Sequence, residues 1–290
     1  MEYRIRFCTL EIVFRSEAEL LIEDAIAAFE ASKASYAAES QLEVPIILTG
    51  QLPEAKGTCC YADSFLRYYK SAEGFSVYTH PDANGMTVMC THWLPDYSAI
   101  RIRMNAQVCT CAVSLHELML YFPLPAVLSH FHAVQLHASR VAIGDAAVLF
   151  CAPSETGKST QARLWKQYAG ARILNNDRTL VQKTKRGFLT GGCLQDGSEP
   201  IRRNDLLRPA AVVLLEQGTE NTIRQSGTLP KMHRLMSQTS AWPWDAAQLT
   251  QNRILWADVL NAMPVYDYAC RPDEESVRVL YRQMRKDGIL

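Results

Sequence analysis

An apolar run that leads into Gly-Lys-Ser-Thr constrains the fold of this chain more than any other feature. Residues 146–150 form a short apolar run, residues 152–156 form a turn of small and polar residues, and residues 161–168 are compatible with a helix. A tight loop between a buried strand and a helix is the layout of a phosphate-binding P-loop. The layout predicts an α/β fold around this loop.

The chemistry expected of such a loop follows from its position at a helix N-terminus. Backbone N–H groups point into the loop, and the helix dipole adds partial positive charge, so an anion is stabilised there. Lys158 is expected to reach the β- and γ-phosphates of a nucleoside triphosphate, and Ser159 to ligate Mg²⁺. The expected nucleotide-binding residues are Ser154, Thr156, Gly157, Lys158, Ser159 and Thr160.

The loop departs from the full P-loop pattern at two positions. Ala152 stands where the pattern has its first glycine, and Glu155 brings a carboxylate into the loop unless its side chain points outward. The alternative interpretation is a strand, a turn and a helix start that bind no ligand. The strand before the loop and the helix after it favour phosphate binding.

Composition narrows the class of protein. The 290 residues are 48% apolar and 21% charged, which is typical of a globular chain, and their net charge of zero argues against a nucleic-acid partner. No apolar run approaches the roughly 20 residues that span a bilayer, and the N-terminus lacks the apolar core of a signal peptide. Nine irregularly spaced cysteines favour free thiols in a reducing, cytoplasmic compartment.

The first part of the chain, residues 1–114, is predicted to be a small α+β module. Residues 3–14 alternate as a strand does, and Ser16 and Glu19 form a capping box that opens a helix reaching Phe29. The sequence Asp-Ala-Asn-Gly at 82–85 indicates a hairpin turn. Further strands are expected at 46–48, 75–78, 86–89 and 100–102.

The second part, residues 115–290, is predicted to be the nucleotide-binding domain. It begins with an apolar helical stretch at 115–131 that Pro123 and Pro125 should split. Asp273 is expected to cap the final helix. Strands are expected at 141–143, 146–150, 172–174, 180–182, 188–189 and 210–215.

Several short motifs follow one another in this second part. Their order is a more specific sign of a protein family than the loop alone. The order resembles that of the HPr kinase/phosphorylase-like family, which shares its P-loop core with ATP-dependent phosphoenolpyruvate carboxykinases, and is closest to small, mostly uncharacterised bacterial relatives. The resemblance covers about residue 115 to the C-terminus. The motifs are Leu136-His137-Ala138-Ser139, the loop, Asn176-Asp177-Arg178, Gly197-Ser198, Asn204, the strand after Pro209, Pro264-Val265-Tyr266 and Cys270-Arg271-Pro272.

The resemblance implies roles for individual residues, with ATP and Mg²⁺ as the bound ligands. Asp177 matches the acidic position that binds magnesium and takes the proton of the acceptor hydroxyl, and His137 matches a histidine close to the active site. Arg178 and Arg202 are candidates to stabilise transition-state charge. Many relatives carry two adjacent aspartates, whereas this chain has Asn176 at the first position.

For each of these residues, a purely structural role is the alternative to a role in function. Asp177 can serve as a turn or cap residue, His137 as a buried histidine bonded to backbone, and Arg202 and Arg203 as a solvated helix start.

The expected function is an ATP- and Mg²⁺-dependent kinase acting on a hydroxyl, that of a serine, in a protein or peptide. The alternative is a non-catalytic nucleotide-binding module that regulates or chaperones a partner. Asn176, Glu155 and Pro200 favour it, since Glu199-Pro200 stands where the resemblance leads us to expect a Ser-Gly pair. Decarboxylating carboxykinase chemistry is disfavoured because no metal-ligand set stands out beyond Asp177. Neither a nucleic-acid nor a membrane partner is expected, and a homo-oligomer is left open.

Overall fold

A computed structural model shows the chain as two units, Met1–His130 and Phe131–Leu290. It describes every residue except 35, 82–83, 110–111, 195–200 and 202. Mixed strands and helices make up each unit, so the chain has α/β content. No helix within the described ranges combines the length and the apolar character needed to cross a membrane.

The boundary between the units falls later than residue 114, where the sequence placed it. Residues 115–130 belong with the first unit because their side chains pack there. The Phe122 ring meets Phe14 edge-on at 5.9 Å between centroids, and the His130 ring lies 5.4 Å from that of Tyr97. The apolar helices after residue 114 therefore contribute to the core of the first unit.

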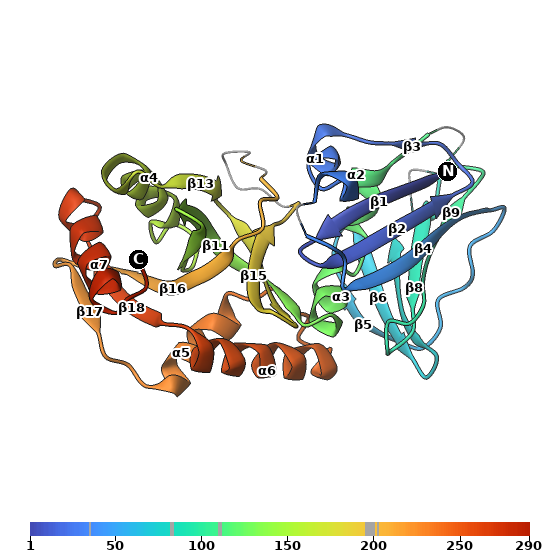
Figure 1. The fold of residues 1–290 in the computed structure, drawn as a ribbon. Helices are drawn as coiled ribbons and strands as arrows, with labels where there is room; N and C mark the ends of the chain where they lie inside the picture. The colour runs from blue at the N-terminus through green and yellow to red at the C-terminus, as the bar shows by residue number, and fades with distance from the viewer. Residues whose placement is uncertain (35, 82–83, 110–111, 195–200, 202) are drawn as a thin grey trace. The chain divides into compact units, whose positions relative to one another are not determined.

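The first unit is built on an eight-stranded sheet in the order β1-β2-β4-β9-β8-β7-β6-β5. The pairs β2/β4 and β4/β9 are parallel and the other neighbours are antiparallel (Figure 1). A two-stranded sheet joins β3 to β10. The strands are β1 (Glu2–Phe7), β2 (Leu10–Ser16), β3 (Leu20–Leu21), β4 (Ser40–Thr49), β5 (Thr58–Ala62), β6 (Leu66–Ser71), β7 (Gly74–Thr79), β8 (Met89–Trp93), β9 (Ile100–Asn105) and β10 (Val113–Ser114). The helices are α1 (Asp24–Ala27), the 3₁₀ helix η1 (Ala31–Lys33), α2 (Leu115–Leu120) and α3 (Leu124–His130).

Two N-terminal predictions are wrong. The strand expected at 3–14 is a hairpin that reverses at Cys8, whose φ is 51°. The helix expected from the capping box to Phe29 is present only as α1 (Asp24–Ala27), because Ser16 ends β2 and its hydroxyl accepts from the N–H of Ala18 at 3.1 Å. Leu20 then pairs with Val113 in a parallel bridge, and that long-range pairing replaces the local helix signal.

The other expected elements of the first unit fall close to observed strands and helices. The stretch at 115–131 is split into α2 and α3 next to Pro123, as predicted. The strand expected at 86–89 is displaced, since β8 begins only at Met89. The hairpin turn expected at 82–85 lies partly outside the described residues.

The second unit has a mixed sheet in the order β15-β14-β11-β12-β16-β18-β17, with β13 also paired to β11. Its central pairs β12/β16 and β16/β18 are parallel. The strands are β11 (Ala133–Ile143), β12 (Ala146–Cys151), β13 (Arg172–Asn175), β14 (Arg178–Thr184), β15 (Gly187–Gly192), β16 (Arg208–Gln217), β17 (Thr222–Arg224) and β18 (Val265–Cys270). The helices are α4 (Lys158–Ala169), α5 (Thr228–Ser237), α6 (Ala246–Ala262) and α7 (Glu274–Lys286).

Helices cover both faces of this second sheet (Figure 1). On one face, Trp165 of α4 and Leu280 of α7 are buried against Phe150. On the other face, Leu235 of α5 and Trp256 of α6 are buried in a second apolar cluster. Burial on both faces explains why the central strands read as continuous apolar runs in the sequence. The result is a three-layer arrangement of helices, sheet and helices.

Candidate functional site

The loop between β12 and α4 occupies residues 152–157. β12 ends at Cys151 and α4 begins at Lys158. Two loop residues have left-handed backbone, Glu155 with φ 63° and Gly157 with φ 113°. Glycine takes such a φ without the steric penalty that other residues meet, so Gly157 lets the chain turn directly into the helix.

The N-terminus of α4 has no side-chain cap. Gly157 occupies the cap position, and the first turn contains no acidic residue. The first intrahelical bond runs from the N–H of Gln161 to the carbonyl of Gly157 at 2.9 Å. The N–H groups of residues 158–160 therefore have no partner inside the helix, and the positive end of the helix dipole faces the loop. Ser159 and Thr160 sit in this turn and are half-buried.

Lys158 is folded over the loop rather than extended into solvent. Its side chain is 6% exposed, and its Nζ donates to the carbonyls of Ala152 at 2.9 Å and Pro153 at 3.0 Å. Burial lowers the pKa of the Lys158 ammonium, and the carboxylate of Asp177 opposes that shift. The ammonium is thus desolvated and interacts electrostatically with Asp177.

Asp177 lies in a network with His137. The Nε2 atom of His137 is 3.1 Å from Oδ1 of Asp177, and its Nδ1 is 3.3 Å from Oε1 of Gln238. The Nε of Arg178 lies 3.5 Å from the other Asp177 oxygen. The hydrogen bond from His137 lowers the pKa of Asp177; burial opposes the shift, and the charges of Arg178, His137 and Lys158 support it. Asp177 is therefore held as a carboxylate whose direction is set by His137.

Strand β11 brings this network beside the loop. Ala138 of β11 pairs with Cys151, the last residue of β12, and its N–H donates to the carbonyl of Asp177 at 2.9 Å. His137 is next to Ala138 in the chain and pairs with Arg178 of β14. Residues far apart in the sequence therefore meet at the middle of β11, close to the start of the loop.

Two residues that contact this network belong to no recognisable motif in the sequence. Gln238 meets His137 through its side chain, and its carbonyl accepts from the N–H of His137 at 2.8 Å. Ser240 accepts from Nη1 of Arg178 at 3.2 Å. Both residues follow α5, and the bridge between Leu136 and Thr239 brings them to β11. No local signal reveals such a long-range bridge.

Arg140 is a further buried residue that the sequence analysis did not single out. It is 0% exposed, and its guanidinium donates to Oδ1 of Asn175 at 3.0 Å and to the carbonyls of Thr190 at 2.9 Å and Asp205 at 2.8 Å. Another bond reaches the carbonyl of Arg203 at 2.9 Å. An arginine within an apolar strand is the signal that could have drawn attention to it. Its contacts tie the 203–205 segment to the sheet.

The candidate residues predicted from the sequence fall into two neighbouring groups. The structure brings Lys158, Ser159, Thr160 and Gly157 to the helix start, and His137, Asp177 and Arg178 to the adjacent network. Ser154 is exposed and Thr156 half-buried in the loop. Arg202 and Ser198 lie outside the described residues.

Glu155 and Asn176, two positions that depart from the patterns expected from the sequence, have distinct surroundings. Glu155 is exposed to solvent, and its carbonyl accepts from Nε2 of Gln217 at 3.2 Å. Asn176 is 7% exposed, and its carbonyl accepts from the hydroxyl of Ser139 at 2.9 Å. The loop carboxylate is therefore in water, whereas the amide that replaces the first aspartate is part of the packed sheet end.

Hard cations such as Mg²⁺ prefer carboxylate and hydroxyl oxygens and keep several waters. Asp177 and Ser159 offer donors of that kind. Among the described residues, no group of three or more His, Cys, Asp or Glu side chains could hold a metal ion. The donors fit a magnesium ion that is held mainly by a nucleotide's phosphates and do not fit a metal bound by protein ligands alone.

Comparison with known proteins adds no family to this description. No family model matches the chain, and no curated protein matches it significantly.

Proposed function

We propose that the second unit binds ATP with Mg²⁺ and transfers the γ-phosphate to a hydroxyl, that of a serine in a protein or peptide, as in the HPr kinase/phosphorylase-like family that the sequence resembles. The observation that carries the proposal is the uncapped start of α4, with Lys158 folded over its loop, beside the pair of His137 and Asp177 that β11 joins to the end of β12. A cation, a helix N-terminus and an oriented carboxylate at one place are what phosphoryl transfer requires. A cytoplasmic location follows from the same proposal.

Phosphate binding would use the free N–H groups of the first turn of α4 together with Lys158. The ammonium of Lys158 now donates to two neutral carbonyls, those of Ala152 and Pro153. A phosphate oxygen is a stronger acceptor for this ammonium than a neutral carbonyl, because it carries negative charge and forms an ion pair as well as a hydrogen bond. Lys158 would therefore leave the loop carbonyls for the β- and γ-phosphates when a nucleotide enters.

Asp177 would serve as a magnesium ligand or accept the proton of the acceptor hydroxyl. Its lowered pKa keeps it ionised at neutral pH, which both roles require. His137 would orient the carboxylate through the 3.1 Å contact. Ser159 would supply a hydroxyl oxygen to the ion, and bound magnesium would neutralise charge on the transferring phosphoryl group.

Arg178 would stabilise the negative charge that develops during transfer. Its guanidinium is half-buried and already oriented by Asp177 and Ser240. A pre-oriented cation stabilises a transition state without a reorganisation cost during the reaction. Arg202 is proposed for the same role on the basis of the resemblance alone.

A second candidate function is nucleotide binding without transfer. Asn176 replaces the first of the two aspartates found in many relatives, and the oxygens of Asp177 already face His137 and Arg178. One carboxylate would then have to bind magnesium and accept a proton. A module that binds ATP to regulate a partner needs only the first of these roles.

Titration calorimetry with ATP and Mg²⁺ tests the binding step. Lys158→Ala should weaken affinity at least about 10-fold, because a charge-assisted contact to phosphate is lost. Lys166→Ala is the matched control, since Lys166 is exposed on the same helix. Absence of ATP binding by the unaltered chain would exclude both candidate functions.

Transfer is then measured with γ-labelled ATP and a library of serine-containing peptides. Asp177→Asn should retain nucleotide binding and lower the transfer rate by about 10²-fold or more, as loss of a general base does. ATP binding with no labelled peptide in the unaltered chain would favour the non-catalytic module. Labelling that survives both Lys158→Ala and Asp177→Asn would show that the chemistry occurs elsewhere.

A further inference from the structure

A cavity of about 480 Å³ lies within the first unit, away from the loop of the second unit in sequence. Its wall is formed by residues 50–55, which follow β4, and by side chains of β6, β7 and β9. Its volume falls within the range of about 300–1,000 Å³ that small-molecule sites occupy. The residues that line it include Glu54, Arg67, Tyr69, Tyr78, Asn105 and Gln107.

Strand register explains why an arginine and two tyrosines line the same cavity. Arg67 of β6 pairs directly with Tyr78 of β7, and Tyr69 lies two residues after Arg67. Successive side chains alternate between the faces of a sheet, so all three side chains share one face. The rings of Tyr69 and Tyr78 stand edge-to-face with centroids 5.7 Å apart. The guanidinium is thus set beside an aromatic pair.

Among the residues that the structure describes, none accepts a hydrogen bond from Nε of Arg67. The residue is half-buried, and its Nε is fully buried. Across the described part of the chain, no carboxylate forms an ion pair with its guanidinium. A buried donor without an acceptor is costly, and such groups in native proteins point to a bound water, ion or ligand. The geometry therefore indicates an acceptor supplied from outside.

The same face of the sheet carries further positive charge. Tyr78 pairs with Cys90, and Cys90 pairs with Arg103, so Arg103 and its i−2 neighbour Arg101 share this face. These charges also act on His92. Its pKa is lowered mainly by burial and in addition by the positive charge of Arg103. A field of this sign favours an anionic ligand.

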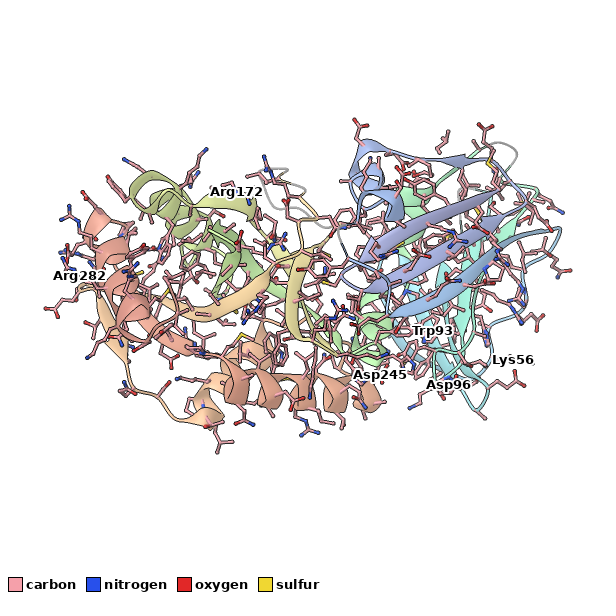
Figure 2. All side chains as sticks on the ribbon, viewed as in Figure 1. Lys56, Trp93, Asp96, Arg172, Asp245 and Arg282 are labelled. Carbon is pink, nitrogen blue, oxygen red and sulfur yellow. The ribbon has the colours of Figure 1, made fainter. Side chains whose placement is uncertain are left out.

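Acidic side chains also lie near this positive face, among them Glu54 and Glu73. Glu54 lines the cavity and is exposed, so its carboxylate is solvated. Glu73 forms an ion pair of 3.6 Å with Lys56, which is exposed and projects outward (Figure 2). Neither acid is bonded to Arg67, and the guanidinium remains available to a ligand.

We propose that this cavity binds an oxyanion, a carboxylate or a phosphate monoester, carried by a small organic ligand that packs against Tyr69 and Tyr78. Arg67 would donate two parallel N–H bonds to the oxyanion, a geometry that suits both groups. Tyr78 contributes its ring rather than its hydroxyl, which is already hydrogen-bonded to Ser76 and Cys90. Gln107 offers a side-chain amide at the same wall. This site does not depend on nucleotide binding by the second unit.

The test is titration calorimetry of the full chain with three probes: inorganic phosphate, O-phosphoserine and N-acetylglutamate. All titrations use the Lys158→Ala background, so that phosphate binding at the loop after β12 does not contribute. Binding of at least one probe is expected. Arg67→Gln should lower the affinity for that probe at least about 10-fold, because a bidentate charged contact is lost. The phosphorylated and carboxylate probes distinguish the two sources of the oxyanion.

Arg101→Gln is the control, because it removes a charge from the same face without altering the cavity wall. It should change affinity less than about 3-fold, the effect of a screened surface charge. If Arg67→Gln does not fold, Arg67→Lys replaces it and should also weaken binding, because it keeps the charge and loses the bidentate geometry. No binding of any probe at 10 mM, or equal affinity in Arg67→Gln and the parent, would overturn the proposal.

Discussion

His137 and Asp177 meet across two neighbouring segments of the second sheet, with Nε2 and Oδ1 3.1 Å apart and side chains 12% and 26% exposed. Neither residue is held by this contact alone. Gln238 faces the other ring nitrogen, and Arg178 faces the other carboxylate oxygen. The pair therefore forms the middle of a short polar chain that sets the direction of one carboxylate beside Lys158.

A double-mutant cycle should detect this pair in stability. With His137→Gln and Asp177→Asn, we expect a coupling free energy of about 1 kcal/mol, since the pair is largely buried and hydrogen-bonded. Urea unfolding of the four proteins measures it. The exposed pair Lys183 and Asp258, 2.7 Å apart, should give less than about 0.5 kcal/mol as a control. Equal coupling in the two cycles would contradict the expected difference.

Acid should remove the contribution of Asp177. The pKa of Asp177 is lowered by the hydrogen bond from His137 and by Arg178, so the unfolded chain takes up this proton at higher pH than the folded chain does. The stabilisation is therefore complete above the unfolded pKa of about 3.9 and is lost as pH falls through the lower folded pKa. The stability difference between the parent and Asp177→Asn should stay constant down to about pH 5 and shrink below about pH 4. A difference that grows on acidification would contradict this sign.

Removing the Lys158 ammonium should change stability little. Lys158→Met keeps the apolar stem, eliminates a buried charge and leaves the carbonyls of buried Ala152 and exposed Pro153 without this donor, and these effects oppose one another. We expect the free energy of unfolding to change by less than about 1 kcal/mol, as for Lys166→Met on the exposed side of α4. Thermal unfolding of both variants checks this. A loss of several kcal/mol from Lys158→Met would mean that the lysine is structural.

The two glycines that flank α4 should respond differently to alanine. Gly157 and Gly170 have φ of 113° and 65°, and an added Cβ would meet no atom within 4 Å at either site. Only backbone strain is therefore tested. Gly170 is near the left-handed helical minimum, where alanine costs about 1 kcal/mol, whereas φ near 113° is farther from any region open to alanine. We expect Gly157→Ala to be the more destabilising, measured by urea unfolding; the reverse order would show that the loop can relax.

The sequence predicted those elements whose signals lie close together in the chain, and it missed those whose pattern is obscured or that depend on long-range pairing. The strand, loop and helix around Lys158 were predicted because an apolar run, turn residues and helix formers are contiguous there. Helix α6 was missed because its buried side includes Gln248 and Asn252 beside Leu255, which obscures the apolar period. The capping box at Ser16 was misleading because Leu20 pairs with a strand more than ninety residues away.

The site shows the same division between local and long-range information. Asp177 and His137 were identified as candidates from short motifs, and the structure brings them into contact. The roles of Gln238 and Ser240 could not be foreseen, because both reach His137 and Arg178 only through a bridge between Leu136 and the chain after α5. Partners supplied by tertiary pairing leave no pattern in their own neighbourhood.

Thiol labelling offers a test of the sheet around the loop. Cys151 ends β12 and is 1% exposed, and burial raises the pKa of its thiol to about 12. Cys59 in β5 is exposed. Because the thiolate is the reactive form, Cys59 should be alkylated at pH 8 at least about 10³-fold faster than Cys151, which reacts only when the sheet opens. Mass spectrometry of peptides over time measures both rates, and comparable rates would show that β12 is not buried at its end.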